Sequence, residues 1–327
     1  MVNIVGHQSL NKRLSCWTAW TLATGALLCA ASTMIGPWNG VADMVAAFLP
    51  FALAFALASV AVSIFVRPFR GLVWLWLTAF AAAAIASWHI APEMTWDETR
   101  PQSGRPVVIV THNMHHGGAS PERLVAVLSE SGADILLLQE NDRRSARALD
   151  TLARLYPYRD SCRACEQAIL SRWPMEVHWQ LPDQRGKPTG PPLFRADVHV
   201  PGVSAPLRVI SLHAPRPVPQ PGQKIFFQGL TDGLRHSKPG LTVLAGDLNL
   251  PPWTATMARL QRDVAPMQRI TRGQFSYPAS IAGFTWPVLP IDHMFVTPDI
   301  AVGSVGRLDP TGSDHLGIRA TLWVSHN

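Results

Sequence analysis

The chain is 327 residues long, enough for two domains, and 47% of its residues are hydrophobic. With a positive mean hydropathy, this composition argues against a wholly soluble protein. The net charge is +6 at pH 7, and the absence of any internal repeat or low-complexity tract excludes a repeat architecture.

Three long apolar segments lie within the first 99 residues, from Leu14 to Ile35, from Met44 to Val66 and from Leu72 to Ile90. Each is close to the roughly 20 residues that a helix needs to cross a bilayer. We therefore expect three transmembrane helices. A signal peptide has an apolar region of only about 7 to 15 residues and would leave two segments unexplained. Buried helices of a soluble bundle are the remaining alternative.

Charges beside these segments predict their orientation. Lys12 and Arg13 precede the first segment, and Arg67 and Arg70 separate the second from the third. Acidic residues occupy the other flanks: Asp43, Glu93, Asp97 and Glu98. The positive-inside tendency places the N-terminus in the cytoplasm and, after three spans, the remaining chain outside it. We expect an integral protein of the bacterial inner membrane. Tryptophans lie near the proposed span ends, as interfacial anchors would: Trp17, Trp38, Trp74, Trp88 and Trp96.

A polar stretch bounded by Pro92 and Pro106 separates the apolar third from the rest of the chain. We expect a membrane anchor over residues 1–99, a linker over 100–106 and a second domain over 107–327.

The four cysteines fall into two pairs. Cys16 and Cys29 lie in or near the first apolar segment and are interpreted as small apolar side chains. Cys162 and Cys165 form CRAC in a polar stretch, where a local disulfide is favoured outside the cytosol. Two unpaired thiols, or a metal or redox role, are the alternatives. A zinc site would need two further ligands, and none is evident at suitable spacing.

Apolar strand-like runs in the second domain begin or end with polar groups. The run VVIVTHN ends in Asn113, ILLLQE ends in Glu140, and RVISLH ends in His213. The run TVLAGDLN carries two polar residues at its end, and two later strands have polar residues at their starts: Asp247, Asn249, Asp292, Asp314 and His315. Helical patterns alternate with these strands. Buried strands place such groups at the rim of a sheet, so we expect an α/β fold with one composite site.

These motifs, in this order, resemble the endonuclease/exonuclease/phosphatase superfamily, over about residues 105 to 327. The matching pieces are Asn113, Gln139-Glu140, Ser171-Arg172-Trp173-Pro174, Leu212-His213, Gly246-Asp247-Leu248-Asn249, Ile291-Asp292-His293 and Gly312-Ser313-Asp314-His315. The resemblance implies a DNase I-like four-layer α/β/β/α sandwich, here preceded by the three transmembrane helices.

The resemblance also implies roles for individual residues. Glu140 and Asn113 would hold a divalent metal, and Asp314 would bind it directly or through water. The expected cofactor is Mg²⁺, with Mn²⁺ or Ca²⁺ as alternatives, because a carboxylate is an oxygen ligand suited to these ions. Asp247 and Asn249 would orient the attacking water and help to deprotonate it.

Two histidines complete the implied catalytic set. His315 would bind the scissile phosphate or act as a base, with Asp292 holding its imidazole in one tautomer. His213 would contact the phosphate and donate a proton to the leaving oxygen. The catalytic prediction is therefore His213, Asp247, Asn249, Asp292 and His315.

Other residues have both a functional and a structural interpretation. Arg172, Arg216 and Trp286 are candidate substrate contacts, with packing as the alternative for Arg172 and Trp286. Several family nucleases carry an acidic residue two positions after the asparagine, where this chain has His115. A metal role for His112, His115 and His116 is an alternative to a purely structural one.

From residue 100 onward the chain has 24 Lys and Arg against 18 Asp and Glu, which suits an anionic substrate or an anionic lipid surface. We expect a membrane-tethered, metal-dependent phosphohydrolase that cleaves phosphodiester bonds in nucleic acid or a phospholipid head group. The expected partners are this substrate and membrane lipid, and no protein partner is evident. A phosphomonoesterase and a non-catalytic sensor or scaffold for a phosphorylated ligand are the alternatives.

Overall fold

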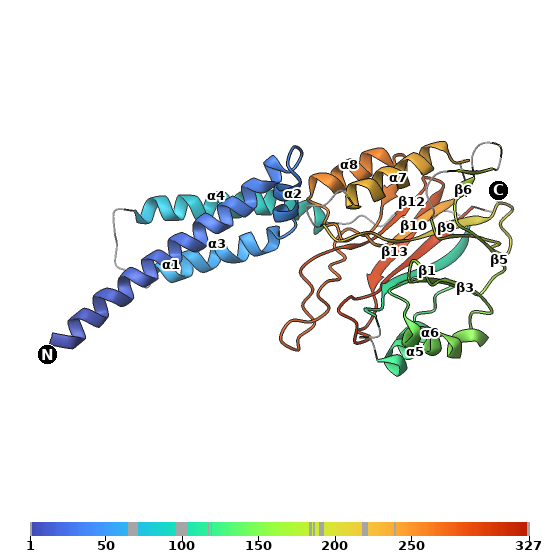
Figure 1. Ribbon diagram of the computed structural model, residues 1–327, viewed down its shortest axis with the longest axis horizontal. Coiled ribbons are helices and arrows are strands. Elements are labelled where there is room, and N and C mark those ends of the chain that lie inside the picture. Colours follow the sequence, from blue (N-terminus) through green and yellow to red (C-terminus); the bar gives the residue numbers. More distant parts are fainter. Residues whose placement is uncertain are drawn as a thin grey trace. The chain divides into compact units, whose positions relative to one another are not determined.

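Figure 1 presents a computed structural model of the chain. The structure describes residues 2–64, 71–95, 104–116, 118, 120–182, 185, 187–189, 193–217, 222–238 and 240–325. The chain divides into two compact units, Met1–Thr95 with Trp253–Thr256, and Trp96–Pro252 with Met257–Asn327. Residues 100–103 of the predicted linker lie outside the described residues, and residues 105–106 belong to the strand Arg105–Asn113.

The first unit is helical and packs through small side chains. Its elements are α1 (Val2–Ile35), α2 (Gly40–Ala46), α3 (Leu49–Ile64), α4 (Leu72–Ile90) and the 3-10 helix η1 (Ala91–Glu93). The buried positions are largely alanines: Ala19, Ala23, Ala26, Ala30, Ala52, Ala56, Ala79, Ala82 and Ala86. Large side chains face outward instead, with Phe80 73% and Trp88 79% exposed. A soluble bundle buries its large apolar side chains, whereas membrane helices pack through small ones.

Two of these helices are long and apolar enough to cross a membrane, Arg13–Ile35 and Leu72–Glu93. In place of one continuous helix from Met44 to Val66, the structure has α2 and α3, whose axes differ by 62°. The two helices form a third candidate span only if they are counted as one bent span. Pro50 accounts for the break, because proline cannot donate a helical hydrogen bond and is tolerated only in a first turn. Several residues used to predict orientation lie outside the described residues: Arg67, Arg70, Trp96, Asp97 and Glu98.

The second unit contains two six-stranded mixed sheets. The first has the order β13 (Ile300–Arg307), β14 (Ile318–Val324), β1 (Arg105–Asn113), β2 (Ile135–Gln139), β4 (Gln167–Ser171) and β3 (Tyr158–Cys162). The second has the order β11 (Gln268–Arg269), β12 (Asp292–Val296), β10 (Thr242–Asp247), β9 (Leu207–His213), β8 (Arg195–Val198) and β5 (Met175–His178). A separate pair consists of β6 (Leu181–Pro182) and β7 (Pro188–Thr189).

Side-chain alternation along the strands builds the layers. In β2, Ile135 and Leu137 enter the core between the sheets, whereas Leu136 and Leu138 belong to the core on the opposite face. Helices cover both outer faces, as Figure 1 shows: α5 (Pro121–Glu130), α6 (Arg143–Asp150) and the 3-10 helix η2 (Thr151–Arg154) on the first sheet, and α7 (Gly222–His236) and α8 (Ala255–Asp263) on the second. The predicted sandwich of two sheets with outer helices is confirmed.

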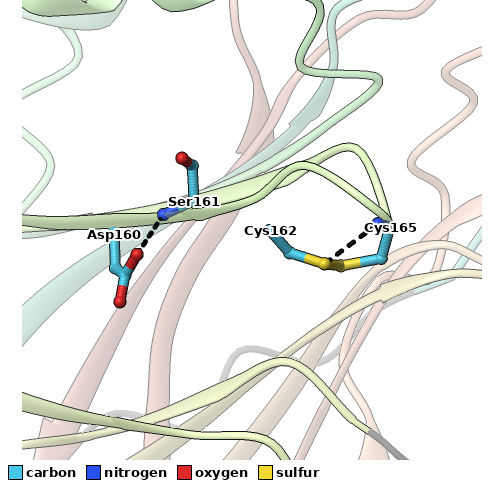
Figure 2. Close-up of a disulfide and its surroundings, with 4 residues drawn as sticks. All are labelled: Asp160, Ser161, Cys162 and Cys165. Carbon is cyan, nitrogen blue, oxygen red and sulfur yellow. Dashed lines mark hydrogen bonds between the residues drawn. A yellow bond between two sulfur atoms is a disulfide. The ribbon is translucent and has the colours of Figure 1, made fainter.

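Cys162 and Cys165 form a disulfide across the turn between β3 and β4, as Figure 2 shows. In the same view, the backbone N–H of Ser161 donates to Oδ1 of Asp160. The structure therefore contains the bridge rather than two free thiols at these positions. Cys16 and Cys29 are free.

Candidate active site

The carboxyl ends of two pairs of parallel strands bring four polar side chains together. In the first sheet β1 and β2 run parallel with Asn113 opposite Gln139, so that Glu140 follows directly. In the second sheet β9 and β10 run parallel with His213 opposite Asp247. Parallel neighbours end at the same edge of a sheet, which explains why runs far apart in the sequence meet here.

Two antiparallel strands bring further groups to the same place from their starting ends. Asp292 begins β12 and lies opposite Asp247. The loop before β14 carries His315, and β14 pairs antiparallel with β1. The Ser313 hydroxyl donates to the backbone oxygen of Asn113 over 2.7 Å, which fixes this loop against the end of β1. Ser313 had no identifiable role from sequence alone.

Asn113 connects the two sheets through its amide. Its Nδ2 donates to Oε1 of Glu140 and to Oδ2 of Asp247, each over 3.0 Å. Its Oδ1 accepts from the backbone N–H of His115 over 2.9 Å. That third bond fixes the orientation of the amide, because an oxygen must face the N–H group. Asn113 therefore acts here as a hydrogen-bond donor to two carboxylates, and its role as a metal ligand stays a prediction.

Asp247 is a buried carboxylate at the centre of the group. Its Oδ1 accepts from the backbone N–H of Asn249 over 2.8 Å, and its Oδ2 accepts from the Asn249 side chain over 3.3 Å. Burial, followed by the charge of Asp292, raises the pKa of Asp247 to about 7, against the opposing effect of His315. Such a carboxyl group can take up and release a proton near neutral pH.

His315 and Asp292 form a buried pair. Nδ1 of His315 lies 2.8 Å from Oδ2 of Asp292, while its Nε2 faces Oδ2 of Asp247 at 3.8 Å. Burial opposes the charged imidazolium, but the charge and hydrogen bond of Asp292 outweigh it and raise the pKa of His315 to about 9. Burial also opposes ionisation of Asp292, yet His315 lowers the pKa of that carboxyl group. The ring centroid of Tyr277 lies 5.0 Å from that of the His315 imidazole. Tyr277 is another residue without a sequence signal.

His213 completes the inner group of polar residues. Its Nε2 lies 3.6 Å from Oε1 of Glu140 and 4.0 Å from Oδ2 of Asp247. Burial lowers the pKa of His213 despite the nearby Glu140 charge. The site therefore combines a histidine that favours the neutral form with a second histidine, His315, that favours the charged form.

Two features of the site suit a metal ion. Asp247, Asp292 and His315 offer ligand atoms that lie within 4.8 Å of one another. Glu140 is 6% exposed, and its Oε2 has no hydrogen-bond partner. A buried carboxylate oxygen without a partner is costly unless a cation or donor satisfies it. Carboxylate oxygens are the ligands that Mg²⁺ and Mn²⁺ prefer.

A cavity of about 360 Å³ lies beside His213. Its lining is mostly apolar and includes Trp179 stacked on Phe194, with ring centroids 5.1 Å apart, and the disulfide cysteines. Gln167 also lines it, is 7% exposed, and has an Oε1 without a hydrogen-bond partner. The cavity can therefore take an apolar group that carries a hydrogen-bond donor.

The structure does not bring every predicted residue to this place. Arg172 follows β4, which runs antiparallel to β2, so it lies beyond the opposite end of the sheet and pairs with Asp134 at 3.8 Å. A substrate contact by Arg172 has no support in that position. Arg216 and Trp286 are exposed side chains, the latter 69% exposed. Asp314 faces His115 at 3.0 Å, and its metal role stays a prediction.

The assembled groups can hold a tetrahedral anion and move protons around it. A charged imidazole can bind an anionic oxygen, and the carboxylate of Asp247 can accept a proton from an adjacent water. Most of these residues were predicted from the ends of strands. Gln139, part of a matching motif with no role predicted for it, supports the site: its Nε2 donates to Oγ1 of Thr111 and to Oγ of Ser211, and so ties β2 to β9.

Comparisons with known proteins agree with this architecture. A model of the Endonuclease/Exonuclease/phosphatase family matches residues 110–315. A search of curated proteins finds no match. The chain is similar to the structure of an endonuclease/exonuclease/phosphatase from Beutenbergia cavernae DSM 12333, with 22% identity and a TM-score of 0.51 over 68% of this chain and 72% of the other.

Two further solved structures have lower identity. A functionally unknown conserved protein from Enterococcus faecalis V583 has 15% identity and a TM-score of 0.51 over 67% of this chain and 100% of that chain. Truncated TDP2 from Caenorhabditis elegans has 19% identity and a TM-score of 0.48 over 67% and 98%. The two structures with TM-scores of 0.51 show a shared fold and no more at these identities.

Proposed function

The chain belongs to the endonuclease/exonuclease/phosphatase family, and on that basis we propose that it is a metal-dependent phosphohydrolase that cleaves phosphodiester bonds through attack by an activated water. One observation carries the proposal: Asp247, the Asn113–Glu140 pair and the Asp292–His315 pair converge from both sheets on one place. The buried Oε2 of Glu140 has no hydrogen-bond partner, only the exposed His116 ring at 3.3 Å, which leaves it available to a cation.

Glu140 would hold the divalent cation, because Asn113 already occupies its Oε1 and leaves Oε2 available. When bound, the cation would neutralise negative charge on the phosphoryl oxygens. The donor set fits Mg²⁺ or Mn²⁺, which favour carboxylate oxygens. Asp314 is kept as a second candidate ligand, with its carboxylate 34% exposed beside His115.

The protein residues would orient the reactants and move the proton. Asp247 would accept a proton from the attacking water, and the two hydrogen bonds from Asn249 would hold the carboxylate in position. His315, charged through its pairing with Asp292, would bind an anionic phosphate oxygen. His213 would lie beside the leaving oxygen; because burial lowers its pKa in the free protein, it would take up a proton once an anionic phosphate lies beside it and then donate that proton to the leaving oxygen. In an in-line attack on a phosphate, positioning of this kind contributes a large share of the rate enhancement.

The helical unit would tether this activity to a membrane. Small side chains inside and large apolar side chains outside are the packing that supports membrane insertion. Lys12 and Arg13, which precede the apolar segment within α1, favour a cytoplasmic N-terminus. With three spans the phosphohydrolase domain would lie outside the cytoplasm, in a bacterium on the outer side of the inner membrane. The disulfide between Cys162 and Cys165 suits that location.

The substrate would be a phosphodiester in nucleic acid or in a phospholipid head group. The surplus of arginine in this part of the chain favours an anionic substrate. The apolar cavity beside His213 would take the organic group next to the phosphate, with Gln167 accepting a hydrogen bond from it. Exposed Arg216 and Trp286 are additional candidate contacts.

A substrate panel tests the proposal. The full chain in detergent would be incubated with DNA, RNA, sphingomyelin, phosphatidylinositol phosphates and chromogenic monoesters and diesters, in Mg²⁺, Mn²⁺ or chelator. We expect metal-dependent diester cleavage that His315→Gln removes. Faster cleavage of monoesters would indicate a phosphomonoesterase instead. Ligand binding without turnover in any metal would indicate a sensor or scaffold and contradict the proposal.

A further inference from the structure

The cavity of about 360 Å³ lies at the same edge of the sheets as the candidate active site. Strand β4 runs antiparallel to β2 with Gln167 opposite Gln139, the residue before Glu140. His213, the last residue of β9, lines the cavity, and its Nε2 also lies 3.6 Å from Oε1 of Glu140. One histidine therefore belongs to both places, and a group that fills the cavity would lie next to the reacting phosphate.

Most of the cavity wall is apolar, and part of it is aromatic. The rings of Trp179 and Phe194 stack with their centroids 5.1 Å apart and their planes inclined by 29°, and Phe226 of α7 contributes a third ring. Trp179 is 47% exposed, so a ligand can reach its ring. Aromatic side chains bind planar rings by stacking. The volume also lies within the range of pockets that hold small organic molecules.

Gln167 places a free polar group in this apolar wall. Side chains alternate along β4, and Gln167 is on the same face as Ile169, which packs in the core between the sheets. Gln167 is 7% exposed, and its Oε1 is buried without a hydrogen-bond partner. Within the described residues no side-chain hydrogen bond fixes its amide, so a half-turn of the last torsion can present either the oxygen or the N–H₂ group to a ligand. A ligand that bonds this amide removes the penalty of an unpaired buried group.

The wall that carries Gln167 is held rigidly. Cys162 lies opposite Gln167 in the pairing of β3 with β4, and its disulfide to Cys165 closes the turn between these strands, as Figure 2 shows. Both cysteines line the cavity. The backbone oxygen of Glu166 accepts from the N–H of Asn141 over 2.8 Å, which joins the turn to the loop after β2. A preformed wall of this kind loses little freedom when a ligand binds.

The lining discriminates between the organic groups that phosphodiesters carry. A choline group has a quaternary nitrogen with neither a donor nor an acceptor for Gln167. Inositol has hydroxyl groups on every side, and this apolar wall would leave most of them unpaired. A planar ring with one polar edge suits both parts of the lining, because its faces contact the aromatic side chains and its edge bonds the amide. Nucleobases, and phenolic rings with a polar substituent, have this form.

We propose that the cavity is the leaving-group pocket of the enzyme, and that Gln167 selects esters whose leaving group is a planar ring with a hydrogen-bonding edge. This rests on the proposed function, in which His213 donates its proton to the leaving oxygen, and it specifies which side of the phosphate the cavity serves. Water forms the new bond to phosphorus and gives a proton to Asp247. The bond from phosphorus to the leaving oxygen breaks, and that oxygen takes the proton of His213.

Matched phosphodiesters test the selectivity. Methyl phosphodiesters of 3- and 4-(hydroxymethyl)phenol would be compared with those of 3- and 4-methylphenol, whose phenols have similar acidity but lack the polar group. The full chain in detergent would be assayed in Mg²⁺ or Mn²⁺. We expect at least one hydroxymethyl ester to have a kcat/KM about three- to tenfold above that of its methyl counterpart, as one additional hydrogen bond to an uncharged group provides.

Gln167→Met separates recognition from stability. Methionine has a similar length and no strong hydrogen-bonding group, so the preference for the hydroxymethyl esters should disappear. Because the amide has no partner in the free protein, this variant should unfold at no lower denaturant concentration than the parent chain. Gln228→Met is the matched control, since it makes the same substitution at an exposed position of α7 outside the cavity lining. The control should retain the preference.

A dinucleotide and a phosphocholine ester complete the panel. Faster cleavage of the dinucleotide than of the aryl esters would identify a nucleobase as the ring, and the reverse order would identify a phenolic ring. Fastest cleavage of the phosphocholine ester would overturn the inference.

The inference and the proposed function fail separately. If the esters are cleaved without preference, or if the preference persists in Gln167→Met, only the inference is overturned. If no ester is cleaved, calorimetry with the same esters in chelator tests the pocket alone. Tighter binding of a hydroxymethyl ester that is lost in Gln167→Met would then support the pocket while the proposed function fails, and equal binding of both members of each pair would overturn the inference as well.

Discussion

At the scale of single residues, the site is governed by the distribution of charge around His315. Asp292 lies on one side of the imidazole and Asp247 on the other, and all three side chains are buried. Burial penalises each charge, so the pair with the shorter contact, His315 and Asp292, keeps its charges. Asp247, close to a second carboxylate, has a raised pKa of about 7. The arrangement therefore provides a charged imidazolium, His315, that can bind phosphate, and a separate carboxylate, Asp247, that can accept a proton.

Replacing Asp292 by asparagine should lower the pKa of His315. Without the opposing carboxylate charge, the burial penalty on the imidazolium is less compensated, and we expect the pKa to fall by about 1 to 3 pH units from its value of about 9. The imidazole of His315 would then lose its proton at a lower pH than it does in the parent chain. Nuclear magnetic resonance titration of histidine-labelled, metal-free protein measures this, with His315→Gln to assign the signal. An unchanged titration in Asp292→Asn would refute the proposed coupling.

The sequence identified the strand-end residues because a polar group after a buried apolar run is rare and informative. It could not show that Asn113 presents its N–H₂ group to Glu140 and Asp247, because that orientation is set by the backbone of His115. Glu166 is four residues along from Cys162, in a turn with no apolar pattern, and only tertiary structure brings its backbone oxygen to the N–H of Asn141, the residue after Glu140.

At the scale of secondary structure, the close approach of β9 and β10 positions the catalytic carboxylate. Gly246 precedes Asp247 and has a φ of 154°, and a side chain there would collide with the backbone oxygen of Leu212 in β9. Only glycine permits these strands to lie this close. The same pairing sets Asp247 opposite His213.

Gly246→Ala should destabilise the fold and displace Asp247. Because the collision is with the backbone, relief requires strand movement, and we expect a loss of more than about 3 kcal/mol. Gly306→Ala in β13 is the control, since a side chain there meets no atom within 4 Å. Chemical denaturation of the two variants measures the difference. Equal stability would show that β10 does not require the close approach.

Strand direction also explains a failure of sequence reasoning. The sequence predicts Arg172 as a substrate contact, with packing as the alternative, and its strand runs opposite to β2 and ends at the far edge of the sheet. Apolar periodicity reveals a strand and its faces, not its direction relative to neighbours. In the helical unit, Pro50 divided a segment whose hydropathy alone predicted one continuous span.

At the scale of the whole molecule, an apolar helical unit and a basic phosphohydrolase-like unit share one chain. The first has the outward-facing large side chains of a membrane bundle, and the second has a net charge of +6 counted from residue 100. Anionic lipid head groups attract basic surfaces within about a Debye length. Composition alone predicted this division, since the apolar residues are concentrated in the first third of the chain.

The tether predicts a defined membrane orientation. A reporter phosphatase that is active only after export, fused after Arg100, should be active, while a fluorescent protein that folds only in the cytoplasm should fluoresce when fused at the N-terminus. The physical reason is the positive charge on the flanks expected to be cytoplasmic, which carry Lys12 with Arg13 and Arg67 with Arg70. An inactive exported reporter, or a protein released from membranes by alkaline carbonate, would contradict the predicted arrangement.

The central claim is that side chains from both sheets form one hydrolytic site. It is tested most directly by comparing diester cleavage by Asp247→Asn with that by Arg172→Gln, a family-motif residue at the opposite end of the sheet. Asp247→Asn should lower the metal-dependent rate by about 10²- to 10⁴-fold, as expected for loss of a general base, whereas Arg172→Gln should retain the parent rate. Equal rates for Asp247→Asn and the parent chain would contradict the account.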